Sequence, residues 1–145
     1  MTNILSHAHS GLRWVLLILL VISIVNALTR KDLFEKKDRL IYLFSMVSAH
    51  IQLVLGISLY FLSSKVQFYE GWMKAALFRF YGMEHLIGML LAIVLITIGH
   101  IKYKKKKENS AKHKTVMVYY AIGLLVILLF IPWPFRELLM VDSWF

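Results

Sequence analysis

The sequence predicts an all-α membrane protein, an antiparallel four-transmembrane-helix bundle that forms a single membrane domain over residues 1–145. Hydrophobic residues make up 59% of the 145 residues and the mean hydropathy is +0.68, which is more apolar than a soluble domain of ordinary composition. A helix needs about 20 apolar residues to cross the hydrocarbon core of a bilayer. The sequence contains four such stretches, separated by charged segments.

The charge and the cysteine content narrow the classes of partner and cofactor. The formal net charge is +9, but the basic residues lie between the apolar stretches, as they do in loops beside a membrane. The sequence therefore predicts a lipid bilayer as its surroundings and no nucleic-acid partner. The chain has no cysteine, which excludes disulfides, thiolate metal sites and iron–sulfur clusters. Histidine is the main soft ligand that remains.

The first two helices are expected at about residues 4–28 and 40–62. Thr2 or Asn3 can cap the first helix. The segment before it lacks the basic region of a signal peptide, so we expect the helix to be retained. The third and fourth helices are expected at about residues 77–103 and 114–131. Pro132 and Pro134 end the fourth helix, because proline lacks the N–H donor that a helix interior needs.

The distribution of Lys and Arg predicts the orientation. The loops at 29–39 and 102–114 hold twelve of the 17 Lys and Arg residues, whereas the opposite side has Lys65, Lys74, Arg79 and Arg136. Positively charged loops remain on the cytoplasmic side of a membrane. We therefore expect a multi-pass protein of the bacterial inner membrane, with both basic loops cytoplasmic and both termini on the outer, periplasmic side.

Three expected helices each place a histidine in the outer half of the membrane. At 1.5 Å per residue, His9 lies roughly 9 Å, His85 roughly 12 Å and His50 roughly 15–18 Å from the outer ends of their helices. Ionisable groups at such depth are costly and usually functional. His100 and His113 lie near the inner side, where we expect ordinary interfacial residues.

Helical periodicity predicts which face of its helix each of these residues lies on. His9 and Arg13 share one face of the first helix, and His85 shares a face of the third with Gly88 and Ala92. Glu84 lies about 100° off that face, where we expect it to pair with Arg13. The second helix has a face of small and polar residues, and His50 lies well over 90° from its centre, so we expect His50 to meet a different neighbour. The face consists of Ser45, Ser48, Ala49, Gln52 and Gly56.

Four stretches carry a resemblance to a known family: Ser6-His7-Ala8-His9-Ser10-Gly11-Leu12-Arg13-Trp14, His50-Ile51-Gln52 leading to Gly56 and Tyr60-Phe61, Glu84-His85, and Ile131-Pro132-Trp133-Pro134-Phe135-Arg136. Over nearly its whole length the chain resembles small bacterial four-helix integral membrane proteins labelled cytochrome b-like. The resemblance implies a b-type haem held by helix histidines, with His9, His50 and His85 at the matching positions. It brings no catalytic signature.

We therefore expect an integral membrane b-type cytochrome-like protein that transfers electrons. Its expected partners are quinone or other respiratory-chain subunits, and a homo-oligomer is compatible with the sequence. Depth and face favour His9 with His85 as a diagonal ligand pair, and His50 with His85 is the alternative. Arg13 is expected to pair with a haem propionate. Two other hypotheses remain open. One is a non-haem Zn, Fe or Cu site built from His9, His50, His85 and Glu84. The other is a cofactor-free structural subunit.

Overall fold

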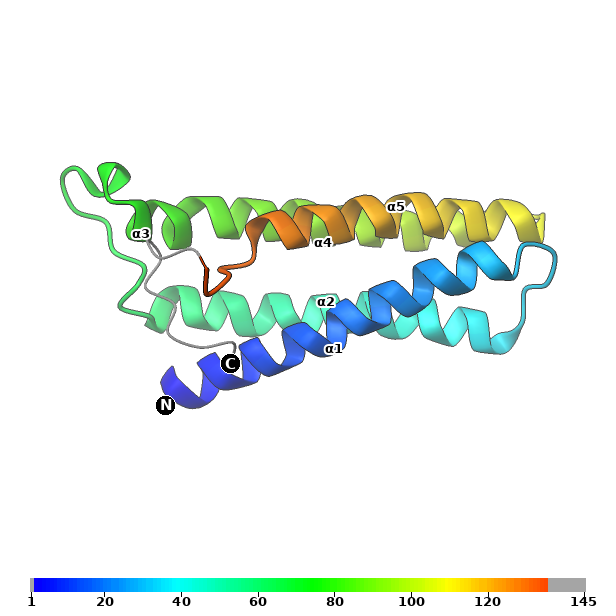
Figure 1. The fold of residues 1–145 in the computed structure, drawn as a ribbon, viewed down its shortest axis with the longest axis horizontal. Helices are drawn as coiled ribbons and strands as arrows, with labels where there is room; N and C mark the ends of the chain where they lie inside the picture. Colours follow the sequence, from blue (N-terminus) through cyan, green and yellow to red (C-terminus); the bar gives the residue numbers. More distant parts are fainter. Residues whose placement is uncertain (1, 136–145) are drawn as a thin grey trace.

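A computed structural model describes residues 2–135 of the chain, so Arg136, part of the sequence resemblance, lies outside the described residues. The long helices are α1 (Thr2–Thr29), α2 (Lys36–Leu62), α4 (His85–Lys104) and α5 (Asn109–Phe130). A short helix α3 (Ala76–Arg79) and a π-helical turn η2 (Phe80–Glu84) lead into α4, and a 3-10 turn η1 (Trp72–Lys74) precedes them. Figure 1 shows the long helices side by side.

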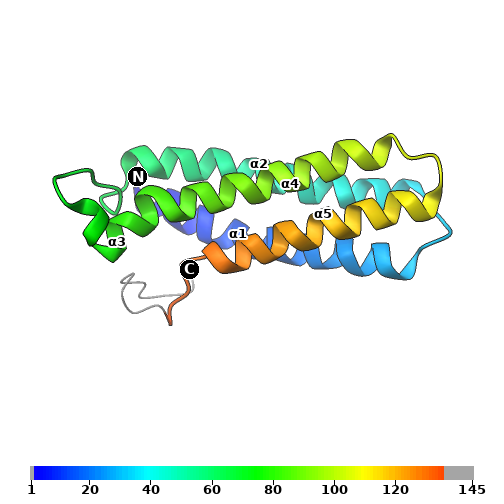
Figure 2. The ribbon, with the colours of Figure 1, turned by 90° about the horizontal axis from the view of Figure 1, so that it is seen from above.

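The order of the helices around the bundle places α1 and α4 across from each other. α1 packs against α2 and α5, and α4 packs against the same two helices. The two views of the ribbon agree on this arrangement (Figure 2). Side chains from α1 and α4 that point inward therefore face each other through the middle of the bundle.

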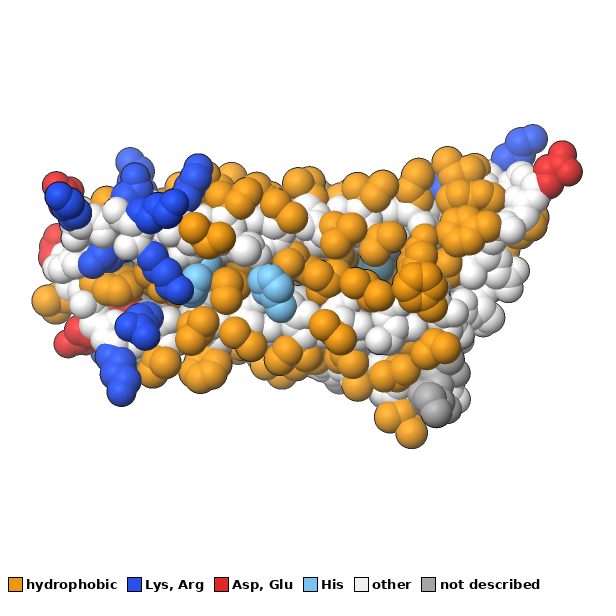
Figure 3. Space-filling view, turned by 180° about the vertical axis from the view of Figure 1, so that it is seen from behind, with side chains coloured by type: hydrophobic (Ala, Val, Ile, Leu, Met, Phe, Trp, Pro, Cys, Tyr) orange, Lys and Arg blue, Asp and Glu red, His pale blue; other side chains and the backbone are white. Residues whose placement is uncertain are grey.

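Among residues 2–135, four helical segments are long and apolar enough to cross a membrane, which confirms the predicted all-helical class and its long apolar helices. They are Asn3–Thr29, Lys36–Leu62, Ala76–Lys104 and Asn109–Phe130. Large hydrophobic side chains are exposed along each of them, among them Ile18, Val54, Val94 and Leu125. Figure 3 shows hydrophobic side chains over the middle of one face, with Lys and Arg gathered at one end.

The connections define the two ends of the bundle. Residues 30–35 and 105–108 join helices at the end that we call the basic end, and residues 63–75 lie at the opposite end, which we call the cavity end (Figure 1). α2 begins at Lys36, earlier than the expected residue 40. The Glu35 N–H donates to the Asp38 carboxylate over 2.7 Å, which satisfies a donor at the start of the helix.

α5 also begins earlier than expected, at Asn109 and not at residue 114. The segment that follows the lysine run is therefore helical, and only residues 105–108 connect α4 to α5. Lysine is a good helix former, and its long stem lets the charge reach water from a helix end. Much of the two basic segments predicted as loops at 29–39 and 102–114 thus belongs to helix ends.

Small residues on α4 serve its packing against α5. A Cβ atom at Gly88 would lie 2.3 Å from Cγ of Phe130, and one at Gly99 would lie 2.4 Å from Cβ of Tyr119. Contacts this short leave no room for a side chain. The glycines therefore allow the two helices to approach closely.

The basic end contains a buried polar network. Asn26 donates to the Asp38 carboxylate over 2.8 Å. His113 Nε2–H donates to the Leu33 carbonyl over 2.8 Å, and the Tyr42 hydroxyl lies 2.6 Å from His113 Nδ1. His100 and His113 are both buried. The expectation that they are ordinary interfacial residues is wrong, because α5 begins early enough to carry His113 into the bundle on the same face as Val116 and Tyr120.

Candidate functional site

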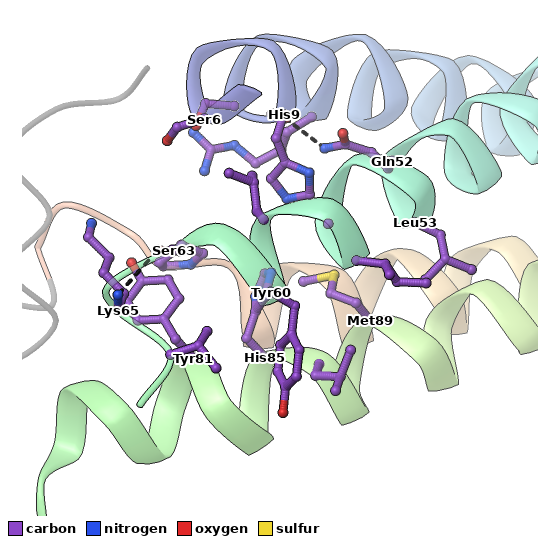
Figure 4. Close-up of a pocket in the computed structure, with 18 of the residues that line it drawn as sticks. Ser6, His9, Gln52, Leu53, Tyr60, Ser63, Lys65, Tyr81, His85 and Met89 are labelled. Carbon is purple, nitrogen blue, oxygen red and sulfur yellow. Dashed lines mark hydrogen bonds between the residues drawn. The ribbon is translucent and has the colours of Figure 1, made fainter. Parts of the chain in front are cut away.

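A cavity of about 580 Å³ lies among the helices at the cavity end. Its apolar part is formed by residues from all four long helices, including Leu16, Leu53, Met89 and Ile127. Its polar part includes serines of α1 and of the connection after α2 (Figure 4). Small-molecule and cofactor sites typically enclose about 300–1,000 Å³. The cavity therefore has the size and the mixed lining of a ligand site.

His9 of α1 and His85 of α4 meet in this cavity. Their ring centroids are 6.4 Å apart and their ring planes are inclined by 74°. Both residues line the cavity, and Figure 4 shows them approaching from opposite sides. The structure thus brings together the diagonal pair that depth and face favoured from the sequence.

The end of α5 fixes the ring of His85. His85 Nδ1 lies 2.7 Å from the carbonyl oxygen of Phe130, so Nδ1 carries the proton and donates it. In a continuing helix the Phe130 carbonyl would accept from the residue four positions later, but that residue is Pro134, which has no N–H. The proline therefore leaves the carbonyl free for His85. In the neutral ring Nε2 then has a free lone pair, as in a histidine that binds a metal.

The π-helical turn η2 sets the position of His85 along the chain. The N–H of His85 donates to the carbonyl of Phe80, five residues earlier. The Tyr60 hydroxyl of α2 donates to the carbonyl of Gly82 over 2.9 Å, which ties α2 to this turn. Single π-helical turns inside α-helices frequently occur at functional sites, because they change the direction of the following side chains.

α2 holds His9 from the other side. The Gln52 amide donates to the carbonyl of His9 over 2.8 Å. A Cβ atom at Gly56 would lie 3.3 Å from Cε1 of His9, so the glycine provides the space that the imidazole occupies. His9 Nδ1 is buried and has no hydrogen-bond partner within residues 2–135. That nitrogen is therefore open to a ligand or a water molecule.

The charged residues of the cavity are basic. Arg13 of α1 and Lys65 of the connection after α2 both contribute to the lining, and the lining residues that the structure describes include no Asp or Glu. Lys65 Nζ lies 5.3 Å from the centre of the Tyr81 ring, which also lines the cavity. This charge distribution favours an anionic group on the ligand.

The structure does not bring His50 to the cavity. His50 Nδ1 donates to the Met46 carbonyl over 2.8 Å, and its Nε2 lies 3.5 Å from the Thr97 hydroxyl of α4. His50 is absent from the cavity lining. It faces a different neighbour from Gln52, as the helical periodicity of α2 indicated.

Glu84 is likewise outside the cavity lining, and its expected pairing with Arg13 is wrong. Arg79 Nε donates to the Glu84 carboxylate over 2.7 Å. Arg79 lies on α3, one helical turn before Glu84, so a local ion pair forms without a partner from α1. Within residues 2–135, no group of three His, Cys, Asp or Glu side chains comes together as a metal site.

Sequence reasoning missed several residues that build the cavity. Gln52 stood on the small and polar face of α2, and its position one turn before Gly56 was a signal for a role beside His9. Tyr60 belongs to a stretch that carries the resemblance, but its contact with Gly82 depends on the π-helical turn and could not be predicted. Lys65 carried no signal, because it lies in an irregular connection. No family model, curated protein or solved structure matches this chain.

Proposed function

We propose that this chain is a membrane electron-transfer protein that binds a b-type haem between His9 and His85. The observation that carries the proposal is the meeting of two imidazoles from opposite helices in one cavity, with ring centroids 6.4 Å apart. Two imidazoles on opposite sides of one metal ion, with metal–nitrogen bonds of about 2 Å each, have ring centres roughly 6 Å apart. His9 and His85 are therefore the residues that would hold a haem iron.

The residues of the cavity fit this group in three further respects. His85 presents Nε2 as a lone pair because its Nδ1–H is bonded to Phe130. His9 Nδ1 is buried without a partner among residues 2–135. Arg13 and Lys65 supply positive charge in a lining that has no described acidic residue, which suits the two propionates of haem. A bound haem would supply one-electron transfer.

The protein contributes the orientation of the ligands and a partly apolar lining. The Phe130 carbonyl holds His85 in one tautomer and raises the basicity of the opposite nitrogen. Apolar side chains such as Leu16, Ile93 and Ile127 provide an apolar surface for the flat faces of the group. Arg13 and Lys65 would offset ligand charge that the apolar surroundings disfavour. These roles belong to side chains of the cavity and to the main-chain carbonyl of Phe130.

We also propose that the bundle is antiparallel in the bacterial inner membrane, with both termini on the periplasmic side. The short connections at 30–35 and 105–108, together with the flanking helix ends, carry most of the positive charge. The positive-inside rule assigns such segments to the cytoplasm. The cavity would then lie toward the periplasm, where quinone or a respiratory-chain subunit is the class of redox partner that this depth suits.

The geometry gives less support to a non-haem metal site. That hypothesis requires His50 or Glu84 beside the pair, but His50 bonds to Met46 and Glu84 pairs with Arg79. Two histidines alone make a weak site for a zinc, iron or copper ion, which usually has three or four protein ligands. The third hypothesis, a subunit without a cofactor, gives no reason for two imidazoles from opposite helices to meet in one cavity.

The test is the visible spectrum and metal content of the chain, expressed with haem supplied and purified in detergent. We expect a Soret band, sharp α and β bands on reduction, and about one haem per chain by pyridine haemochrome assay. A colourless protein with stoichiometric zinc or copper would refute the haem assignment. A protein with neither haem nor metal would favour the structural hypothesis.

A further inference from the structure

The buried face of α2 carries polar side chains over most of the length of the bundle. Five buried residues form this polar line: Asp38, Tyr42, Ser45, Ser48 and Gln52. They recur every three or four residues, so they share one helix face. Between the first and the last the helix rises roughly 21 Å, about two thirds of a hydrocarbon core. Polar groups at such depth are costly and usually mark a pathway or a ligand.

Both ends of the polar line meet groups that connect it to its surroundings. At the basic end, Asp38 lies 3.0 Å from Arg30, whose side chain is partly exposed. At the cavity end, Gln52 bonds to the His9 carbonyl and lines the cavity. The cavity in turn reaches the exposed residues Ser64 and Lys65. The line thus runs from the basic end of the bundle to the cavity at the other end.

Two polar atoms at the cavity end of the line, and one of α1 beside them, have no hydrogen-bond partner within residues 2–135. They are Ser48 Oγ, Gln52 Oε1 and His9 Nδ1. Ser48 is 5% exposed and Gln52 is 8% exposed, so bulk solvent does not reach them directly. Buried polar atoms that lack protein partners are usually satisfied by internal water. The three atoms therefore indicate ordered water between α1 and α2.

The spacing of the line suits single water molecules. Residues one helical turn apart are separated by about 5.4 Å, which is close to two hydrogen bonds of roughly 2.8 Å. One water can therefore bridge Ser48 to Gln52. Another can donate to Ser45 Oγ, whose own hydroxyl lies 3.0 Å from the Leu19 carbonyl and 3.1 Å from the Ile41 carbonyl. Nearer the basic end, the hydroxyls of Ser23 and Ser45 form a direct hydrogen bond over 2.8 Å.

We propose that the polar line is a water-filled proton path from the basic end of the bundle to the cavity at His9. A proton would enter at the Asp38 end and pass along the waters and hydroxyls. At each step one O–H bond forms as another breaks, and no group changes its oxidation state. The path does not require the haem assignment, because the residues that form it lie along α2 and not between the imidazoles.

The hydration of the path can be tested with cysteine substitutions, because the native chain has no cysteine. Ser48→Cys places a thiol in the path, and Val47→Cys, at nearly the same depth, places one on the exposed apolar side of α2. Aqueous Ag⁺ ions would titrate each thiol in lipid vesicles. We expect Ser48→Cys to react at least about tenfold faster, since a thiol in water ionises more readily than one in an apolar medium.

Equal, slow reaction of Ser48→Cys and Val47→Cys would overturn the proposal. Should Ser48→Cys fail to fold, Ala49→Cys places the thiol on the same buried face and serves the same comparison. Conduction is tested in vesicles that contain a pH-sensitive dye, with a potassium diffusion potential as the driving force. We expect wild-type vesicles to acidify faster than protein-free vesicles, and Ser48→Val to lose most of that difference.

Acidification at the protein-free rate by wild-type vesicles, or undiminished acidification by Ser48→Val, would overturn proton conduction. Val47→Ile is the matched control and should conduct as wild type does. Neither measurement depends on haem. A protein without a haem spectrum that still conducts would refute the haem assignment and support the path, and the reverse result would do the opposite.

Discussion

At the scale of single residues, prolines near the end of α5 prepare the site. Pro134 cannot donate to the Phe130 carbonyl, which therefore accepts from His85. In the same way, Pro132 cannot donate to the Leu128 carbonyl, which accepts from the Trp133 indole over 2.9 Å. A helix end usually leaves carbonyl groups that need partners. Here one of those groups orients an imidazole in the cavity.

Gly56 is the residue that makes room for His9, which gives a direct prediction. In Gly56→Val, the Cβ atom would lie 3.3 Å from His9 Cε1 and the added methyl groups would displace the ring. Overpacking of this kind costs about 1–3 kcal/mol, so haem affinity should fall roughly tenfold or more. Titration of haem into the apo-protein measures this affinity. Gly11→Val is the control, because nothing lies within 4 Å of a Cβ atom there.

If Gly56→Val bound haem with the affinity of the wild type, the His9 ring would not need its present position.

Single side-chain contacts were the part of the structure that the sequence predicted least completely. Periodicity could place His9 and His85 on facing surfaces, since it depends only on spacing. Periodicity could not predict that Arg79 forms an ion pair with Glu84, because the choice between a local and a distant partner depends on side-chain conformation.

At the scale of elements, the π-helical turn η2 links α2 to the helix that carries His85. Tyr60→Phe removes the hydroxyl that donates to the Gly82 carbonyl. We expect a loss of about 1 kcal/mol in the free energy of unfolding, because the bond is lost while the ring still packs. Denaturant unfolding in detergent measures it. Tyr69→Phe, on an exposed ring, should change stability much less, and equal effects of both would contradict this role for Tyr60.

The interface between α4 and α5 depends on glycine. Gly88→Ala and Gly99→Ala would each place a Cβ atom within 2.4 Å of a side chain of α5. We expect each to destabilise the bundle by about 1–3 kcal/mol, because the helices must move apart. Thermal unfolding in detergent would check this, with Gly11→Ala as the control. Unchanged melting temperatures for Gly88→Ala and Gly99→Ala would mean that the interface is looser than these distances indicate.

Hydrophobicity predicted which helices exist but predicted their starts less well. The four apolar stretches became the four long helices, because each is long enough to span a bilayer. α2 and α5 begin in charged sequence, where an apolar pattern gives no signal. The Glu35 and Asp38 pair is a capping motif that could have located the start of α2. The turn η2 has no comparable signature in the sequence.

At the scale of the whole molecule, the distribution of Lys and Arg predicts the orientation of the bundle in the membrane. Asp32→Cys and Gln67→Cys place single thiols in exposed connections at opposite ends. A membrane-impermeant maleimide applied to cells with a permeable outer membrane should label Gln67→Cys and not Asp32→Cys, because the proposed orientation keeps the basic segments in the cytoplasm. Disruption of the inner membrane should allow both to react. Labelling of Asp32→Cys alone in intact cells would invert the topology.

The site as a whole could be predicted in part. Depth and face favoured His9 with His85, and the order of helices around the bundle places their helices across from each other. The cavity could not be predicted, because it depends on residues 63–66 and on the end of α5 as well as on the helix faces. The buried network of His113 and Tyr42 was missed because the start of α5 was placed too late.

The most direct test of the central claim is the haem content per chain of three variants, His9→Ala, His85→Ala and His50→Ala, each purified as the wild type is. Because His9 and His85 face each other in the cavity while His50 bonds to Met46, the account predicts loss of haem in the first two and retention in the third. Retention of haem by His9→Ala together with its loss from His50→Ala would contradict the account and assign the ligands to His50 and His85.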